Sequence, residues 1–549
     1  MFFEKFFYIF AEIKHIKIGE INMENTNKFL EALSMIGHTE NGAVTNTTTK
    51  NVFVDQFGKA GNYRGRDINE VFADQKALWD ADPTDSLRFI FYLRMITRKT
   101  KVNDNFVTDK VQKGQGARDE AFKRLLWVAK YHEDVFNENI WLLPIVGSWR
   151  DLWVLMYLDH TLGLGAINKE VIFVLLAQGM KLNEHVNNIK KFMPRIESKS
   201  KCTTPWNLVT NNLAKEFAKY IGMNSPKYNK FKASGTAHDF QKKICARNYD
   251  EIKWNLIPGK ALSNLVNSRF LDNHKLTKSY MDWLDTKETV PFNGYVYELA
   301  KNWRACNGNP IKEITLNKQF DKLIATAKED GKIHENVWCA LDTSGSMRAL
   351  TSANVSALDI CLSLGIYFST LNEGAFHKNV VMFDNVSTIK SLQGNFCDMA
   401  RSIFNGTIAW GSTNFQSIID LMITTRRRNP NIPLDDYPTT ILVISDMQFN
   451  SVGSVETNYE FMKKRLKAVF PSEYVDSLKF VWWDCISRVK NDFPATIDDA
   501  GCYFFSGFDG AIVSLLLGEN DEKKPSTPIS AEEMVQKALS QEILLQVKA

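Results

Sequence analysis

The stretch that most constrains the fold is the apolar run 337–341, which ends in Asp342 and continues into small hydroxyl residues. An apolar run bounded by a Gly/Ser turn is typical of a buried strand in a parallel sheet. Ligands of such sheets bind just beyond the carboxyl ends of the strands. We therefore expect Asp342, Ser344 and Ser346 in a loop at that edge. Carboxylate and hydroxyl oxygens suit a hard cation such as Mg2+, and the loop has no His or Cys to favour zinc.

An Asp-x-Ser-x-Ser segment also occurs in ordinary serine-rich turns, so this loop alone leaves both interpretations open. Two later segments favour the cation site. Thr413 lies in a loop, 410–416, that runs into a helical pattern at 415–423, and Asp446 ends a second apolar run at 440–445. Together these positions resemble the metal-ion-dependent adhesion site of von Willebrand factor A domains, in order and in context. The ligands implied by the resemblance are Asp342, Ser344, Ser346, Thr413 and Asp446.

The resemblance also implies how such a site works. The three hydroxyls ligate the metal, and the two aspartates act directly or through water. The implied ion is Mg2+, or another divalent cation such as Mn2+ or Ca2+. One coordination position stays open for an acidic side chain of a partner protein.

Length and composition bound the remaining possibilities. A chain of 549 residues, 44% hydrophobic and 24% charged, is typical of two or three globular domains. Residues 1–330 contain 48 Lys/Arg and 38 Asp/Glu, whereas residues 331–549 contain 19 and 25. A basic front half indicates a polyanionic partner, although solvated helix faces give the same balance. The eight cysteines form no CxxC pair, so we expect buried thiols in a reducing compartment and a cytoplasmic location.

The first residues are apolar, but Glu4, Lys5, Glu12 and Lys14 interrupt the run and no cleavage site follows. We therefore expect neither a signal peptide nor a membrane span. Met23 is an alternative start of the chain. The Asn, Lys, Ile and Phe content favours an AT-rich genome, viral or from a low-GC bacterium, and a phage-encoded protein would point to the virion.

Helical periodicity dominates the front half, at 68–79, 87–97, 117–131, 149–158, 169–182 and 208–221. Antiparallel helices at this spacing indicate diverged HEAT-like repeats. The expected fold class is therefore α plus α/β: a helical repeat domain followed by a doubly wound, Rossmann-like von Willebrand A domain. The predicted divisions are an N-terminal extension and loop segment (1–66), the helical domain (67–330), the A-like domain (331–518), and a linker with a C-terminal helix (519–549). We expect a monomer.

Two basic stretches, 94–130 and 181–253, interleave cations with aromatic residues, a pattern that fits single-stranded nucleic acid. Each aromatic taken alone is better explained as a core residue. The candidate RNA-binding residues are Arg94, Arg98, Lys99, Lys101, Lys113, Arg118, Lys191, Arg195, Lys230 and Lys243.

Several segments of the front half resemble TROVE-like proteins with a C-terminal von Willebrand A domain, including a branch known as a domain of unknown function. These segments are 39–42, 114–119, 147–152, 191–195, 245–252 and 257–261. The similarity to Ro ribonucleoproteins is remote and mainly architectural. It implies a helical ring, closed by the A domain, that binds small or misfolded RNA, and it assigns no individual RNA-binding residue.

No catalytic set is evident, because the sequence has no P-loop, no HExxH pattern and no triad. Asp342 and Asp446 resemble a two-metal nuclease pair only superficially, since hydroxyl ligands supply too little negative charge for that chemistry. We expect a noncatalytic RNA-binding scaffold with a metal-dependent adhesion site. The alternative is a protein–protein adhesion or assembly module, for example a phage structural or cargo protein, without RNA binding.

Overall fold

The computed structural model describes residues 32, 34–96, 98–103, 106–235, 239–292, 294–329, 336–351, 354–405, 407, 410–487, 492–510 and 529–549. Side chains of residues 98–111 and of Lys199 are outside this description. The expected features at 1–31 and the linker 519–527 also lie outside the described residues.

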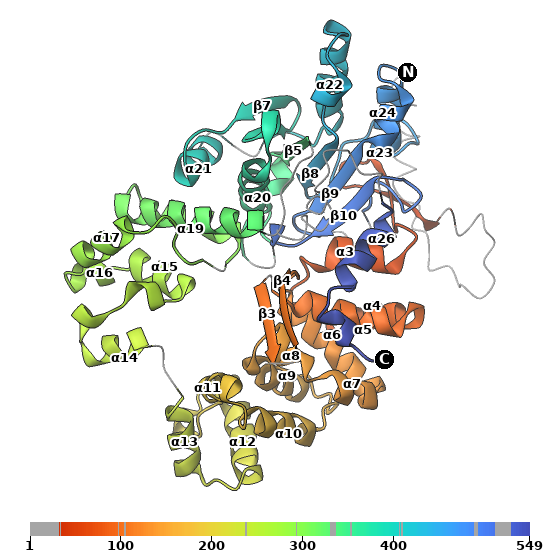
Figure 1. Cartoon of the computed structure of the whole chain (residues 1–549). Helices are drawn as coiled ribbons and strands as arrows, with labels where there is room; N and C mark the ends of the chain where they lie inside the picture. The colour runs from red at the N-terminus through yellow and green to blue at the C-terminus, as the bar shows by residue number, and fades with distance from the viewer. Residues whose placement is uncertain are drawn as a thin grey trace, which may run out of the picture.

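The front half is helical, as its periodicity predicts, and its helices follow one another along a curved path that leads back to the α/β part (Figure 1). These helices are α4 (Ile68–Ala81), α5 (Pro83–Arg94), α6 (Arg118–Tyr131), α7 (Glu133–Asn139), α8 (Leu142–Val146), α9 (Trp149–Thr161), α10 (Lys169–Gly179), α11 (Asn183–Phe192), α12 (Pro205–Tyr220), α13 (Ser225–Ala233), α14 (Asp239–Ala246), α15 (Gly259–Asn267), α16 (Phe270–Asn273), α17 (Thr277–Asp285), α18 (Val296–Cys306) and α19 (Pro310–Glu329).

Start signals explain where two predicted boundaries were wrong. Helix α5 begins at Pro83, earlier than predicted, because the Asp82 side chain accepts a hydrogen bond from the Asp85 N–H and Pro fits the first turn. Helix α12 begins in the same way at Pro205, with Thr204 as its cap. The sequence pattern placed each helix start at the first periodic apolar residue. Both helices actually begin a few residues before that point.

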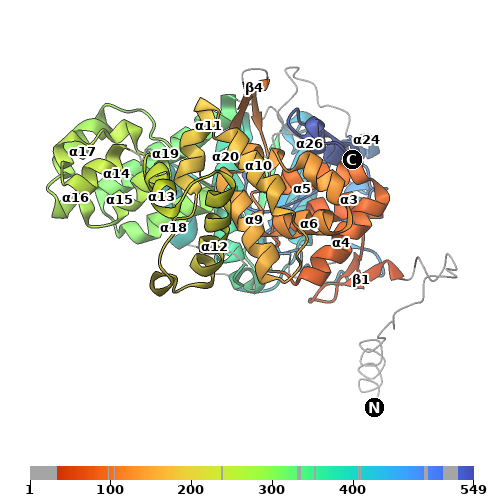
Figure 2. The same cartoon turned by 90° about the horizontal axis from the view of Figure 1, so that it is seen from below.

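Helices α14 to α17 have a hydrophobic core of their own, separate from the core that unites the other helices with the sheet. Trp254 and Tyr280 both belong to this core, and their rings pack edge to face with centres 5.1 Å apart. In both views these helices lie at the opposite end of the molecule from α3 to α6 (Figures 1 and 2). Helix α19 joins this group to the α/β part, since it contacts both α15 and α20.

The back half is a six-stranded mixed sheet in the order β10-β9-β8-β5-β6-β7. All pairs are parallel except β6 with the edge strand β7. The strand order reverses between β5 and β8, and this is where ligands of open α/β sheets bind. The strands are β5 (Val337–Asp342), β6 (Asn379–Phe383), β7 (Ser387–Ser391), β8 (Thr440–Ser445), β9 (Lys479–Asp484) and β10 (Cys502–Ser506).

Helices cover both faces of this sheet. Consecutive residues of a strand point to opposite faces, and on β9 the Trp483 ring meets Phe368 of α20 (Ala357–Leu371), whereas Trp482 meets Tyr459 of α23 (Asn458–Lys467). Helix α22 (Gln416–Arg428) packs beside α23. Helix α21 (Phe396–Asn405) contacts α19 and α20. The expected α/β architecture of the back half is therefore confirmed at this level.

Two segments from the ends of the chain complete the sheet edge. The sequence predicted an extension and loop segment over 1–66, but Val52–Ala60 form helix α3, capped by Asn51, and pack on β10. The stretch was misjudged because its apolar residues are embedded in polar, Thr-rich sequence. Helix α26 (Ala531–Leu539) packs on α3, α5 and β10, so the expected C-terminal helix lies on the body.

Two basic segments also have regular structure. Residues 426–428 form the last turn of α22, where cations complement the helix C-terminus. Strands β3 (Arg98–Asn103) and β4 (Phe106–Gln112) form an antiparallel hairpin in the first basic stretch, and β4 stands out from the body in Figure 2. Of the eight cysteines, all free thiols, six are buried as expected, Cys202 is half-buried and Cys245 is exposed.

A buried ion pair links α5 to α9. Arg94 donates to Asp151 at 2.9 and 2.5 Å, and both side chains are almost fully buried. We predict that Asp151→Ala lowers the free energy of unfolding by about 3–5 kcal/mol, because it leaves the arginine charge buried without its counterion. Denaturant unfolding of the full chain measures this.

The matched control is Asp80→Ala, which removes the partner of Lys76 from an exposed ion pair. It should change stability by no more than about 1 kcal/mol. Equal effects of the two substitutions would contradict the assignment of a structural role to the buried pair.

Candidate functional site

The site is built on the ends of the two central parallel strands, β5 and β8. Leu341 pairs with Ile444, so Asp342 and Asp446 follow at the same edge of the sheet. Both carboxylates are enclosed, with Asp342 0% and Asp446 2% exposed. The structure thus brings together two of the five predicted metal-site residues at the point where the strand order reverses.

Hydrogen bonds fix the Asp342 carboxylate. Its Oδ1 accepts from the Ser344 N–H at 2.9 Å, and its Oδ2 accepts from the Ser445 hydroxyl at 2.5 Å. Ser445 in turn accepts from the Met447 N–H at 3.0 Å. Met447 has φ of +63°, which is unfavourable for a residue with a side chain and marks local strain beside Asp446.

The hydroxyl residues of the first loop lie against the loop that contains Thr413. The Ser344 and Ser346 hydroxyls are 3.1 Å apart. The Gly345 N–H donates to the Gly411 carbonyl at 3.2 Å, and the Trp410 N–H donates to the Thr343 carbonyl at 3.2 Å. These two bonds join loops that are separated by more than sixty residues of sequence.

Thr413 is also tied to the loop that follows Asp446. Its N–H donates to the Asn450 side chain at 3.1 Å, and its carbonyl accepts from the Asn450 N–H at 2.9 Å. The Thr413 side chain is buried. All five predicted residues therefore lie on three loops that hydrogen bonds hold together at one edge of the sheet.

The electrostatics of this edge favour a cation. Burial, and next the nearby charge of Asp446, raise the pKa of Asp342, whereas the bonds from Ser445 and Ser344 lower it. Two enclosed carboxylates repel each other unless a proton or a cation lies between them. Within the described ranges, no three His, Cys, Asp or Glu side chains gather to hold a metal. A cation here would therefore use hydroxyl oxygens besides the two carboxylates, and that donor set fits Mg2+.

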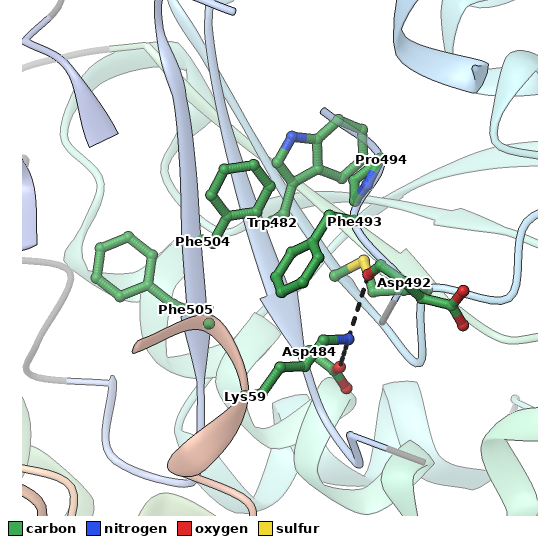
Figure 3. A pocket seen from close by; sticks show the side chains of 10 residues that line it. Lys59, Trp482, Asp484, Asp492, Phe493, Pro494, Phe504 and Phe505 are labelled. Atoms are coloured by element: carbon green, nitrogen blue, oxygen red, sulfur yellow. Dashed lines mark hydrogen bonds and ion pairs between the residues drawn. The ribbon is translucent and has the colours of Figure 1, made fainter. Parts of the chain in front are cut away.

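The sequence did not reveal the polar network behind Asp446. Gln448 donates from its N–H to Asp446 at 3.3 Å and from its side chain to Asp492 at 2.5 Å. Lys59 of α3 donates to the Asp492 carbonyl at 3.2 Å and to Asp484 at 2.8 Å (Figure 3). Lys59, Asp484 and Asp492 are each 3% exposed. No local sequence signal pairs a lysine in a short helix with an aspartate more than four hundred residues later.

The candidate RNA-binding residues whose side chains the structure describes do not form one surface. Arg94 is buried against Asp151, so its selection was wrong, because the basic stretch includes a structural ion pair. Lys113 is also buried. Lys243 contacts Asp239 and Glu251. The side chains of Arg98, Lys99 and Lys101 lie outside the described residues, and the exposed candidates are Arg118, Lys191, Arg195 and Lys230.

Three of the exposed candidates belong to a basic surface formed by α11, α13 and the segment between α11 and α12. Residues 181–235 contain eleven Lys/Arg and three Asp/Glu. The Lys190 ammonium lies 4.4 Å from the centre of the Phe231 ring and so joins α11 to α13. Burial, and next the charge of Arg195, lower the pKa of Lys232, which indicates crowded cations.

Comparisons with known proteins give the following similarities. Residues 337–546 match a family model described as a domain of unknown function, DUF7788. That match includes α26, in agreement with its packing on the sheet edge. An uncharacterized protein of Acanthamoeba polyphaga mimivirus is 20% identical over 528 residues, which cover 89% of this chain and 86% of the viral protein. This relative is consistent with the viral alternative drawn from composition.

The crystal structure of the Deinococcus radiodurans RO (RSR) protein is similar with a TM-score of 0.39 and 12% identity, over 89% of this chain and 98% of that one. None of the helices in the described ranges is long and apolar enough to cross a membrane.

The raised pKa of Asp342 predicts a pH dependence of stability without divalent cations. Because the folded pKa, about 7, exceeds the ordinary value of 3.8, the folded state binds more protons than the unfolded state between these values. The free energy of unfolding should therefore fall as pH rises from about 4 to about 7, by a few kcal/mol at about 1.4 kcal/mol per pKa unit.

Denaturant unfolding in EDTA across this pH range tests the effect. Other groups also titrate, so the comparison variants are Asp342→Asn, which removes the group, and Asp384→Asn, which changes a half-buried carboxylate at the end of β6. The decrease in the free energy of unfolding with rising pH should be smaller in Asp342→Asn than in wild type, and the same as wild type in Asp384→Asn. Parallel curves for wild type and Asp342→Asn would refute the prediction.

Proposed function

We propose that this chain is a noncatalytic scaffold that binds a partner protein through a divalent cation. Asp342, Ser344, Ser346, Thr413 and Asp446 would hold the cation in the manner of a von Willebrand A domain. Bound there, Mg2+ would offer a strong ionic bond to a carboxylate of the partner. The observation that carries this proposal is the convergence of three hydrogen-bonded loops around two enclosed carboxylates.

The surface beside these loops suits a protein partner with an acidic residue. Trp410 is 71% exposed, and the Arg348 guanidinium lies 5.7 Å from the centre of its ring. Leu350, two residues further along, is 64% exposed. An exposed aromatic, an arginine and an aliphatic side chain are typical anchors of protein interfaces. The arginine would add attraction for a carboxylate that approaches the cation.

Cation binding is tested with Mn2+ as a spectroscopic substitute for Mg2+. Electron paramagnetic resonance on the full chain should detect one bound Mn2+ that Mg2+ displaces. We predict that Asp342→Asn and Thr413→Val each weaken binding at least about ten-fold, because even residues outside the ligand sphere typically cost that much. The control Asp384→Asn should bind as wild type does.

Absence of Mn2+ binding by wild type would overturn the proposal, as would equal binding by all four proteins. Thermal unfolding provides an independent readout. Mg2+ at one hundred times its wild-type dissociation constant should stabilise wild type by about 2.7 kcal/mol and Asp342→Asn by no more than about 1.4 kcal/mol.

RNA binding is a second candidate function, and the basic surface on α11 and α13 favours it. Lys191, Arg195 and Lys230 are exposed there, beside the half-buried aromatic rings of Phe192 and Phe231. The Lys191 ammonium lies 5.2 Å from the Phe192 ring. Cations that hold phosphates beside rings that stack on bases are the usual means of binding single strands.

We predict that the triple variant Lys191→Gln, Arg195→Gln, Lys230→Gln weakens binding of a short fluorescent single-stranded RNA. The slope of log affinity against log salt should become shallower by about 2, since each lost phosphate contact contributes about 0.7. Fluorescence anisotropy at several salt concentrations measures both quantities.

The control variant also loses three positive charges. It carries Gln in place of Lys76, Lys260 and Lys464, which are exposed on other surfaces of the protein. It should keep the wild-type slope. If wild type ignores RNA at low salt, RNA binding is excluded and the assembly function without RNA is favoured. If both triple variants behave alike, this surface is not the site.

A further inference from the structure

The N-terminal part of the chain contributes a turn that reaches the candidate cation site. Strands β1 (Ile36–His38) and β2 (Val44–Asn46) form a hairpin around residues 39–43. Gly42 has φ of +79°, a conformation that suits glycine in such a tight turn. The Thr39 N–H donates to the Ala43 carbonyl at 2.9 Å and closes the turn.

This turn is docked on the loop that follows Asp446. The Thr39 hydroxyl donates to the Phe449 carbonyl at 2.7 Å, and the Glu40 N–H donates to the Gln448 side chain at 2.6 Å. Gly42 forms a β-bridge with Asn450. Three consecutive residues of the loop, 448–450, therefore contact the turn, and the same loop carries a carboxylate of the site.

Asn41 extends from the turn to a predicted metal ligand. Its side-chain nitrogen donates to the Gln448 carbonyl at 2.5 Å and to the Thr413 hydroxyl oxygen at 3.4 Å. A carbonyl oxygen can only accept, so the amide must point its N–H groups toward this edge. The two bonds use both N–H groups of Asn41 and fix the orientation of its amide.

We infer that Asn41 is a positioning residue of the cation site, and this inference rests on the proposed function. A threonine hydroxyl oxygen has two lone pairs. When Asn41 donates to one of them, the other can point to the cation. Residues that hydrogen-bond to a metal ligand orient that ligand and tune its affinity for the metal. Asn41 is itself exposed, so it lies where this edge of the sheet meets solvent.

The arrangement couples the cation to the docking of the turn. The 446–450 loop contains Asp446 and also binds residues 39–42. If the cation holds this loop in its observed conformation, it also favours the docked turn, and the docked turn favours cation binding to the same degree. The site is therefore a composite of the N-terminal segment and the α/β part.

The test compares Asn41→Leu with Asn46→Leu in the full chain. Both asparagines lie in the same hairpin, and Asn46 donates to the Phe493 carbonyl at 3.1 Å without a contact to Thr413. Asn41→Leu should weaken Mn2+ affinity by about ten-fold, whereas Asn46→Leu should keep the wild-type affinity. Mn2+ affinity is measured by electron paramagnetic resonance.

A second measurement leaves the N-terminal turn unmutated, so that it does not depend on the fold of an Asn41 variant. Mg2+ should slow amide hydrogen exchange in residues 36–46 of wild type and leave it unchanged in Asp342→Asn. If wild type binds no Mn2+, the proposed function itself fails. If wild type binds Mn2+ but Asn41→Leu binds equally well and exchange in 36–46 does not respond, the inference about Asn41 is overturned.

Discussion

The repulsion between Asp342 and Asp446 is the constraint around which the α/β part is arranged. Two carboxylates at adjacent strand ends, both enclosed, cannot be stable as bare charges. The hydroxyl of Ser445 and the N–H of Ser344 offset part of this cost for Asp342. What remains is a local excess of oxygen ligands and negative charge, and a divalent cation would neutralise it.

The loops around these carboxylates depend on sequence that is far away. Residues 39–62 contribute the docked turn, helix α3 and Lys59, which binds Asp484 in the core. The last twenty residues contribute α26, which covers α3 and β10. The Lys59–Asp492–Gln448–Asp446 series of contacts connects the N-terminal helix with the candidate cation site. The edge of the sheet is thus formed by three separate parts of the chain.

The sequence predicted the helical front half, the two apolar runs that form β5 and β8, and the loops on which the five site residues lie. These features have local signals, such as apolar runs and polar residues at strand ends. Helix α3 was missed because only a few apolar residues mark it, and β7 because it is an exposed edge strand. Asn41 and Gln448 carry no local signal, since their roles arise from contacts across hundreds of residues.

The basic residues show a further limit of sequence reasoning. Charge counts singled out Arg94 and Lys191 alike, although one is buried in an ion pair and the other is exposed. Burial depends on tertiary packing, which a run of cations does not report. Tertiary packing places Arg94 in the interior and Lys191 on the surface of α11 and α13.

The central claim is most directly tested by crystals of the full chain soaked in Mn2+ and measured at a wavelength where manganese scatters anomalously. The account predicts an anomalous peak in contact with the hydroxyls of Ser344, Ser346 and Thr413, next to Asp342 and Asp446. A map without a peak at this edge of the sheet, at Mn2+ concentrations that saturate ordinary protein sites, would contradict it.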